Sequence, residues 1–228
     1  MPVHADWSLT IDVDAVLRCQ GADPDALRAR SPRLVEAAER ALEEGKPLLI
    51  PQVLYERLPV QEIRHEQVNL HGGKRLQGAL PAQHLAGARE VAVVICTIGP
   101  ELEARSSALA REDIVYGLAL DGVGSAGVEA LANAVCASFE AQARETGQQT
   151  TIPLSPGMVG WPVEQGQPQI FGLLDSSKIG VRLSPSMLMI PRKSLTFAVG
   201  FGQQMSETAR TCDYCSLKGT CRYQDHYV

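Results

Sequence analysis

Apolar residues recur at helical spacing through the first 45 residues. A short apolar stripe begins at Val13 and ends near Gly21. A second helix is predicted to start at Ser31, which suits an N-cap because Pro32 then occupies the first helical position. Gly45 follows the last apolar residue of this stripe and suits the left-handed position after a helix. The N-terminal part is therefore expected to begin with two helices.

The following residues change to a β pattern. Residues 46–80 contain short apolar or alternating runs, with a hairpin-like reversal at residues 71–74. Residues 91–98 are almost continuously apolar, as expected for an interior strand. Residues 178–183 and 194–200 also have strand character. These runs together predict one sheet with a buried central strand.

Two long helices are expected between the buried strand and the last strands. The first covers residues 102–120 and the second residues 126–146, with the glycine-containing residues 121–125 leading from one to the other. An apolar stripe in the second helix predicts its buried face, and it consists of Val128, Leu131, Val135 and Phe139.

The pattern as a whole predicts an α+β fold with a mixed, mainly antiparallel sheet flanked by long helices. We divide the chain into an N-terminal helical and β segment at residues 1–90, a core at residues 91–205 and a cysteine-rich tail at residues 206–228. An ordered loop rich in proline and glycine belongs to the core.

Composition narrows the class of protein. Hydrophobic residues make up 45% and charged residues 21% of the 228 residues, which is ordinary for a soluble domain. The net charge of −5 argues against a nucleic-acid partner. Residues 1–10 do not resemble a signal peptide, and the longest apolar run, residues 91–96, is too short to cross a bilayer. We expect a cytoplasmic protein with no membrane partner.

Three of the six cysteines lie close together at the C-terminus, as Cys212-x2-Cys215-x5-Cys221. In a reducing compartment such spacing favours a metal site over a disulfide. Thiolates suit an iron–sulfur cluster, and we favour a [4Fe–4S] cluster. Zinc is the alternative, with His226 as a possible fourth ligand. Reactive thiols without metal are the simplest third interpretation.

The other cysteines and the histidines receive simpler interpretations. Cys19 and Cys136 are expected to be small packed residues on helices. His65, His71 and His84 have no short ligand spacing, so we interpret them as surface residues.

Prolines and glycines are concentrated between residues 151 and 202. Apolar residues such as Met158, Trp161 and Met189 are interleaved with them, which is not typical of a solvated linker. Proline fixes φ and glycine permits positive φ, so together they specify one irregular path. We expect an ordered loop packed on the sheet, either as a ligand surface or simply as a cover.

The same region resembles a known family. Ser155-Pro156-Gly157 is followed by an apolar run, a short Phe-Gly-Leu-Leu helix, the segment at residues 178–184, and then Ser186, Met189, Pro191 and Ser194. This order is similar to the activation (reactivation) domain of vitamin B12-dependent methionine synthase. The resemblance covers residues 119–194, about a third of the chain.

The resemblance implies a ligand site. In that family an Arg-x-x-Pro-Gly-Tyr segment binds S-adenosylmethionine, and the domain caps the corrinoid during reductive methylation. Pro153 stands at the arginine position and Met158 at the tyrosine position of this chain. Candidate cofactor-binding residues carried over from the resemblance are Glu129, Ser155, Pro156, Gly157, Met158, Trp161, Ser186 and Met189.

The function expected from these features is corrinoid maintenance. The chain would dock on a corrinoid-binding protein, contact its cobalamin, and help to return cob(II)alamin to cob(I)alamin with an electron from the C-terminal cluster. One alternative is a non-catalytic adaptor whose tail is folded by zinc. Another is an accessory domain for methyl transfer that binds S-adenosylmethionine.

Overall fold

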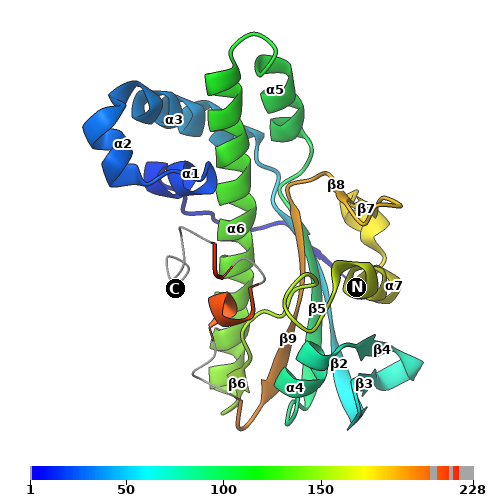
Figure 1. Cartoon of the computed structure of the whole chain (residues 1–228). Helices are drawn as coiled ribbons and strands as arrows, with labels where there is room; N and C mark the ends of the chain where they lie inside the picture. The colour runs from blue at the N-terminus through cyan, green and yellow to red at the C-terminus, as the bar shows by residue number, and fades with distance from the viewer. Residues whose placement is uncertain (1, 206–209, 216–217, 221–228) are drawn as a thin grey trace.

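A computed structural model describes residues 2–205, 210–215 and 218–220 (Figure 1). Its main sheet has seven strands in the order β4-β3-β2-β5-β9-β6, and β1 pairs with β2 off this path. Each strand pairing is antiparallel. The strands are β1 Val3–His4, β2 Gln52–Arg64, β3 Gln67–Leu70, β4 Arg75–Gln77, β5 Glu90–Thr97, β6 Gln149–Thr150 and β9 Ser194–Gly202. A separate two-stranded hairpin pairs β7 Arg182–Leu183 with β8 Met189–Ile190.

Helices surround this sheet. The α-helices are α1 Val13–Cys19, α2 Pro24–Arg30, α3 Pro32–Gly45, α4 Ala79–His84, α5 Glu101–Leu109, α6 Ile114–Glu145 and α7 Val163–Leu173. Short 3-10 helices are η1 Lys46–Leu48, η2 His71–Gly73, η3 Ser176–Ile179 and η4 Thr211–Tyr214. The α+β class with an antiparallel sheet and long helices, expected from the sequence pattern, is confirmed.

One face of the sheet is covered by α6, which runs along it in Figure 1. The expected stripe of Val128, Leu131, Val135 and Phe139 is buried there against β5 and β9 residues. The β5 strand is buried along almost its whole length, as its apolar run predicted. The second half of α6 is therefore fixed in position by the sheet.

The opposite face is covered by the segment rich in proline and glycine. Leu154, Trp161, Ile170 and other apolar residues of this segment pack in one cluster with sheet residues such as Val93. Leu154 also forms an isolated antiparallel bridge with Ala198 of β9. In Figure 1 α7 and its flanking loops lie on the side of the sheet away from α6. The loop thus packs on the sheet.

The boundary placed at residue 90 divides residues that share this sheet. β2 pairs with β5 from Gln52 opposite Thr97 to Pro59 opposite Glu90. Residues 1–90 and 91–205 therefore contribute to one sheet.

The long helix begins earlier than expected. The expected change of element at residues 121–125 is wrong, since α6 is continuous from Ile114 to Glu145 and the break lies before it, where Asp113 caps the Tyr116 N–H. The glycines serve close packing. A Cβ on Gly122 would lie 2.8 Å from Gln20 Cγ, and one on Gly124 would lie 2.8 Å from Leu102 Cδ2. Helix–helix approach therefore explains these glycines without a break in the helix.

Packing also corrects two N-terminal expectations. Gly45 is the last residue of α3 and has right-handed φ of −81°, so it is not the left-handed residue after the helix. Close packing explains the glycine, since a Cβ there would lie 2.9 Å from Val123 Cγ1. Residues 24–30 form an additional helix, capped by Asp23, that the apolar pattern missed because none of its residues is buried.

The strand expected at residues 178–183 is shorter in the structure. Only Arg182–Leu183 are strand, and η3 precedes them.

The α6 helix is long and apolar enough to span a membrane by composition alone. Its most apolar window is 61% buried inside the molecule, against α1, α3, α5 and the sheet. We therefore interpret α6 as a core helix.

Candidate functional site

The segment from Ser155 to Trp161 forms a compact double turn, which we call the 155–161 turn. Met158 N–H donates to the Ser155 carbonyl at 3.1 Å, and Trp161 N–H donates to the Met158 carbonyl at 2.9 Å. Gly157 N–H closes the turn by donating to the Trp161 carbonyl at 2.7 Å. Gly157 has φ of 103° and Gly160 has φ of 90°, which L side chains rarely adopt. The two glycines therefore allow this path.

Trp161 anchors the turn in the core. Its side chain is fully buried, and its Nε1 has no hydrogen-bond partner among the residues that the structure describes. Cβ atoms on Gly78 and Gly166 would approach the indole to 2.7 Å and 2.9 Å, so both glycines make room for the ring. In this arrangement the ring packs inside the protein, and the role of Trp161 in ligand binding stays a prediction.

The remaining residues of the turn differ in accessibility. The Met158 side chain is 9% exposed, and its Sδ accepts a hydrogen bond from the Ser155 N–H at 3.4 Å. Ser155, Pro156 and Gly157 are half-buried. Val159 projects outward with 61% exposure, so it is the apolar side chain that the turn offers to a partner.

Ser186 and Met189 lie apart from the turn in sequence, on the β7–β8 hairpin. Ser186 is exposed in the connection, with its hydroxyl 3.0 Å from that of Ser184. Met189 is half-buried against the same cluster that contains Trp161. The neighbouring Leu188 is 60% exposed. The hairpin thus offers a second exposed apolar side chain.

Glu129 lies on α6, at a cavity between α6, α1 and the N-terminal segment. The cavity has a volume of about 340 Å³, and its polar lining consists of Ser8, Thr10, Arg18, Cys19, Glu129 and Asn133. The Cys19 thiol donates to Glu129 Oε2 at 3.6 Å. Burial raises the pKa of the Glu129 carboxyl. The pKa of the Cys19 thiol is raised to about 12, mainly by burial and to a smaller extent by the negative charge of Glu129. Cys19 lines this cavity in addition to packing in the core.

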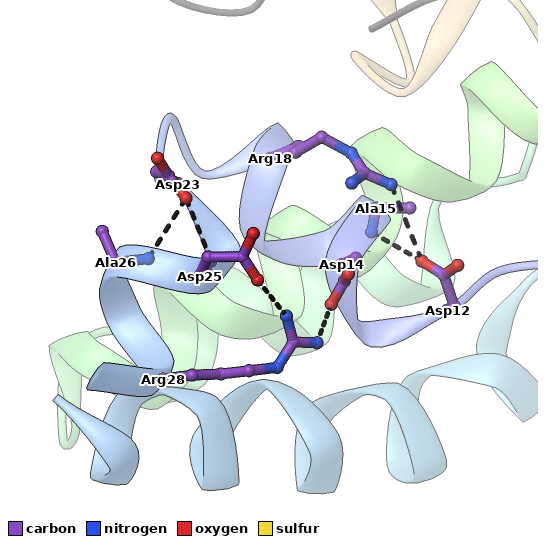
Figure 2. Close-up of polar contacts among 8 residues, drawn as sticks. All are labelled: Asp12, Asp14, Ala15, Arg18, Asp23, Asp25, Ala26 and Arg28. Atoms are coloured by element: carbon purple, nitrogen blue, oxygen red, sulfur yellow. Dashed lines mark hydrogen bonds and ion pairs between the residues drawn. The ribbon is translucent and has the colours of Figure 1, made fainter. Parts of the chain in front are cut away.

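Figure 2 shows how the α1 wall of this cavity is held. Asp12 accepts from the Ala15 N–H at 2.7 Å and lies 4.0 Å from the Arg18 guanidinium. Arg28 of α2 bridges Asp14 and Asp25, which ties α2 to α1. These contacts fix the wall that carries Arg18 and Cys19.

A second cavity, of about 500 Å³, lies further along α6. It is lined by Glu140 and Arg144 of the helix and by residues 148–153, including Pro153. Glu129, Asn133, Cys136, Glu140 and Arg144 follow one another at intervals of three or four residues, so they share one side of α6. A polar stripe therefore connects the cavity at Glu129 with the beginning of the loop.

Cys212 and Cys215 lie on and just after η4. Both thiols are free and half-buried, and Cys221 lies outside the residues that the structure describes. Within the described ranges, no group of three or more histidine, cysteine or acidic side chains is arranged to hold a metal ion. The metal site predicted for the three cysteines stays a prediction.

The described part of the tail contacts the 155–161 turn. The Val159 N–H donates to the Tyr214 carbonyl at 2.9 Å. The Tyr214 ring meets the His84 ring edge to face, with centroids 4.5 Å apart. Because Cys215 is adjacent to Tyr214 and Cys212 is on the same helical turn, Cys212 and Cys215 lie beside the 155–161 turn.

No protein-family model and no curated protein matches the sequence. Among solved structures, the chain is similar to the MetH reactivation domain bound to AdoHcy, with a TM-score of 0.65. The similarity covers 92% of this chain and 81% of that chain, at 14% sequence identity. The chain has the fold of the MetH reactivation domain. The fold expected from the resemblance is confirmed over far more of the chain than residues 119–194.

Within the reactivation-domain fold, the candidate residues fall into three places. The turn brings together Ser155, Pro156, Gly157, Met158 and Trp161, the hairpin carries Ser186 and Met189, and Glu129 lies on α6 at its own cavity.

The sequence did not indicate the contact between Tyr214 and His84. His65 and His71 are exposed as expected, whereas His84 is half-buried against Tyr214. Their contact spans residues far apart in sequence, so no local pattern indicates it.

Proposed function

We propose that this chain is an accessory protein of corrinoid chemistry. It docks on a corrinoid-binding protein through the face that carries the 155–161 turn and helps to reduce cob(II)alamin to cob(I)alamin. The electron enters through an iron–sulfur cluster held by Cys212, Cys215 and Cys221.

The reactivation-domain fold supports the docking part of this proposal. Val159 and Leu188 are 61% and 60% exposed on the two segments singled out by the resemblance, so both side chains are available for contact with a partner. A corrin ring and its surrounding protein offer large apolar surfaces that such side chains can cover.

The observation that carries the redox part is the contact between the tail and the turn. The hydrogen bond from Val159 to Tyr214 places Cys212 and Cys215 next to the segment expected to face the corrinoid. A tail packed on the other face of the sheet, against α6, would instead have favoured a purely structural role for the cysteines. The proximity therefore favours electron transfer over the adaptor alternative.

The chemistry of the donors fits a soft metal centre. Cys212 and Cys215 are free thiols on one turn of η4, and thiolate is the preferred ligand of iron–sulfur clusters and of zinc. When bound, an iron–sulfur cluster supplies one electron at low potential, whereas zinc supplies none. The Lys218 ammonium lies 2.7 Å from Asp213, so the segment between the cysteines carries its own charge pair.

The test uses anaerobically purified, reduced protein mixed with a cob(II)alamin-loaded corrinoid protein. Wild-type protein should produce the absorption of cob(I)alamin, and single variants with serine at Cys212, Cys215 or Cys221 should not. Cys136→Ser is the matched control, because that half-buried thiol lies on α6 away from the motif. Equal rates in all variants would remove the redox role.

Metal analysis distinguishes the redox proposal from the adaptor alternative. Zinc in the purified protein, with no visible absorption from iron–sulfur bands, would favour a structural tail and a non-catalytic docking role. Iron and sulfide in the protein would favour the proposal.

A second candidate function is binding of an AdoHcy-like ligand, because the solved structure with this fold is bound to AdoHcy. The cavity lined by Glu140, Arg144 and Pro153 could receive such a molecule. We expect S-adenosylmethionine to bind weakly or not at all, since Pro153 cannot supply the cation that the resembled family uses to hold a carboxylate.

Calorimetry tests this second candidate. Micromolar affinity, about −8 kcal/mol, would contradict the expectation of weak binding and revive a role in methyl transfer. Pro153→Arg should tighten binding by about tenfold if the missing charge is the reason, because a hydrogen bond to a charged group contributes about 1.5–3 kcal/mol. Pro153→Gln, without the charge, is the matched control.

A further inference from the structure

Tyr214 makes two different contacts with separate parts of the chain. Its carbonyl accepts the Val159 N–H at 2.9 Å, and its ring lies edge to face with His84 at 4.5 Å. Its side chain also packs against the core cluster that contains Trp161. One tail residue thus contacts both the 155–161 turn and α4.

The surface that receives Tyr214 is itself well ordered. The Leu80 N–H at the start of α4 donates to the Gly160 carbonyl at 3.1 Å, so α4 and the turn are already joined. His84 is at the end of α4, and its Nε2 is buried without a hydrogen-bond partner in the described part of the chain. Desolvation lowers the pKa of His84, which keeps the ring neutral and suited to an aromatic contact. α4 and the 155–161 turn are therefore joined by a contact that does not involve the tail.

The position of Tyr214 within the cysteine motif gives this contact a consequence. Cys215 follows it directly, and the Cys215 N–H donates to the Cys212 carbonyl at 3.3 Å across η4. A residue fixed between two cysteines of one tight turn restricts where both thiols can lie. Holding Tyr214 in place therefore also restricts the positions of Cys212 and Cys215.

We propose that Tyr214 is a positioning residue that holds Cys212 and Cys215 against the 155–161 turn, with His84 as the residue that its ring contacts. This inference rests on the proposed function, because the contacts of Tyr214 would bring the metal held by the cysteines to the face that meets the corrinoid. The contacts of Tyr214 with Val159 and His84 belong to the apoprotein, so they can be tested without metal or corrinoid.

Hydrogen exchange of the Val159 amide tests these contacts directly. Tyr214→Ala and His84→Ala should each accelerate exchange of this amide by about tenfold or more, because both remove the ring contact that keeps its acceptor in place. Tyr214→Phe and His84→Phe keep an aromatic ring at each position and should restore protection. Gln83→Ala, at an exposed neighbour on α4, should leave protection unchanged.

Two outcomes would overturn the inference. One is a Val159 amide that exchanges equally fast in wild type and in both alanine variants. The other is a Tyr214→Ala protein that loses its metal, because Tyr214 would then belong to the metal site. Exchange of the Leu80 amide, which bonds to Gly160, serves as the internal check that the variants are folded.

The rate of electron delivery to cob(II)alamin tests this inference separately from the proposed function. Tyr214→Ala should retain its metal but deliver electrons to cob(II)alamin at least about tenfold more slowly, with Tyr214→Phe close to wild type. If the cysteine variants deliver electrons as fast as wild type, or wild type delivers none, the proposed function fails while the exchange result still decides whether Tyr214 holds the described part of the tail. An undiminished rate in Tyr214→Ala would contradict the positioning role.

Discussion

The 155–161 turn and the described part of the tail lie in contact but are held in different ways. The turn has three internal backbone hydrogen bonds that involve Gly157, Met158 and Trp161, and the buried Trp161 side chain anchors it in the core. The tail piece at residues 210–215 is joined to the turn by the bond between Val159 and Tyr214, with a ring contact to His84. The turn is thus held by the hydrophobic core and the tail by docking.

This difference shows two ways to place a functional segment. A turn fixed by core packing keeps its shape whether or not a ligand or partner is present. A segment rich in cysteine can instead gain much of its stability from a metal, because metal binding contributes to folding free energy. The two regions should therefore respond differently to substitution. Three experiments compare them, and a fourth concerns Glu129 on α6.

The largest effect is expected in the tail. Simultaneous serine substitution of Cys212, Cys215 and Cys221 should remove almost all bound metal, because thiolates supply the ligands and a structural metal can contribute about 10 kcal/mol or more. The free energy of unfolding of the core, followed by tryptophan fluorescence, should stay close to wild type. Unchanged metal content measured by elemental analysis would place the site elsewhere.

The converse experiment breaks the turn. Trp161→Ala should lower the free energy of unfolding by about 3–5 kcal/mol, because it leaves a cavity under the turn. Trp161→Phe should cost less, since a ring remains and the unpartnered Nε1 is removed. Urea unfolding measures both. An alanine variant as stable as wild type would show that the turn is not anchored by this side chain.

Thiol reactivity sharpens the comparison. Burial raises the pKa of Cys19, Cys96 and Cys136 from 9.0 to about 12, so their thiolate fraction falls by a factor on the order of a thousand. Iodoacetamide at neutral pH should therefore label the half-exposed Cys212 and Cys215 first in chelator-treated native protein. Mass spectrometry follows the order of labelling. Early modification of Cys96 would show that the core opens on the same timescale.

The smallest effect concerns Glu129, on α6. Its raised pKa means that folding favours the protonated form, so the wild type loses stability as pH rises from the unfolded value of about 4.3 through the folded value. Glu129→Gln cannot ionise and avoids this loss. Urea unfolding at about pH 3.5 and about pH 7 should show the stability difference moving in favour of Glu129→Gln at the higher pH. A constant difference would mean that the carboxylate is well solvated.

Periodicity predicted the elements that pack on the sheet. The apolar run of β5 and the stripe of α6 around Leu131 appeared where the sequence placed them, because burial selects apolar residues at the period of each element. The pattern failed at residues 24–30, a helix with no buried residue, and at Gly122 and Gly124, which look like a break but pack inside one helix. Local signals of glycine cannot distinguish a turn from a close helix–helix approach.

By itself the sequence indicated that the proline- and glycine-rich segment between residues 151 and 202 packs on the sheet, because apolar residues are interleaved with its prolines and glycines. It also determined the spacing of Cys212 and Cys215 on one short turn. Only the tertiary structure decided that this turn lies against Val159 and His84, and that Trp161 is enclosed. The physical reason is distance along the chain: 55 residues separate Val159 from Tyr214, and contacts of that range depend on how the sheet brings both segments to one face.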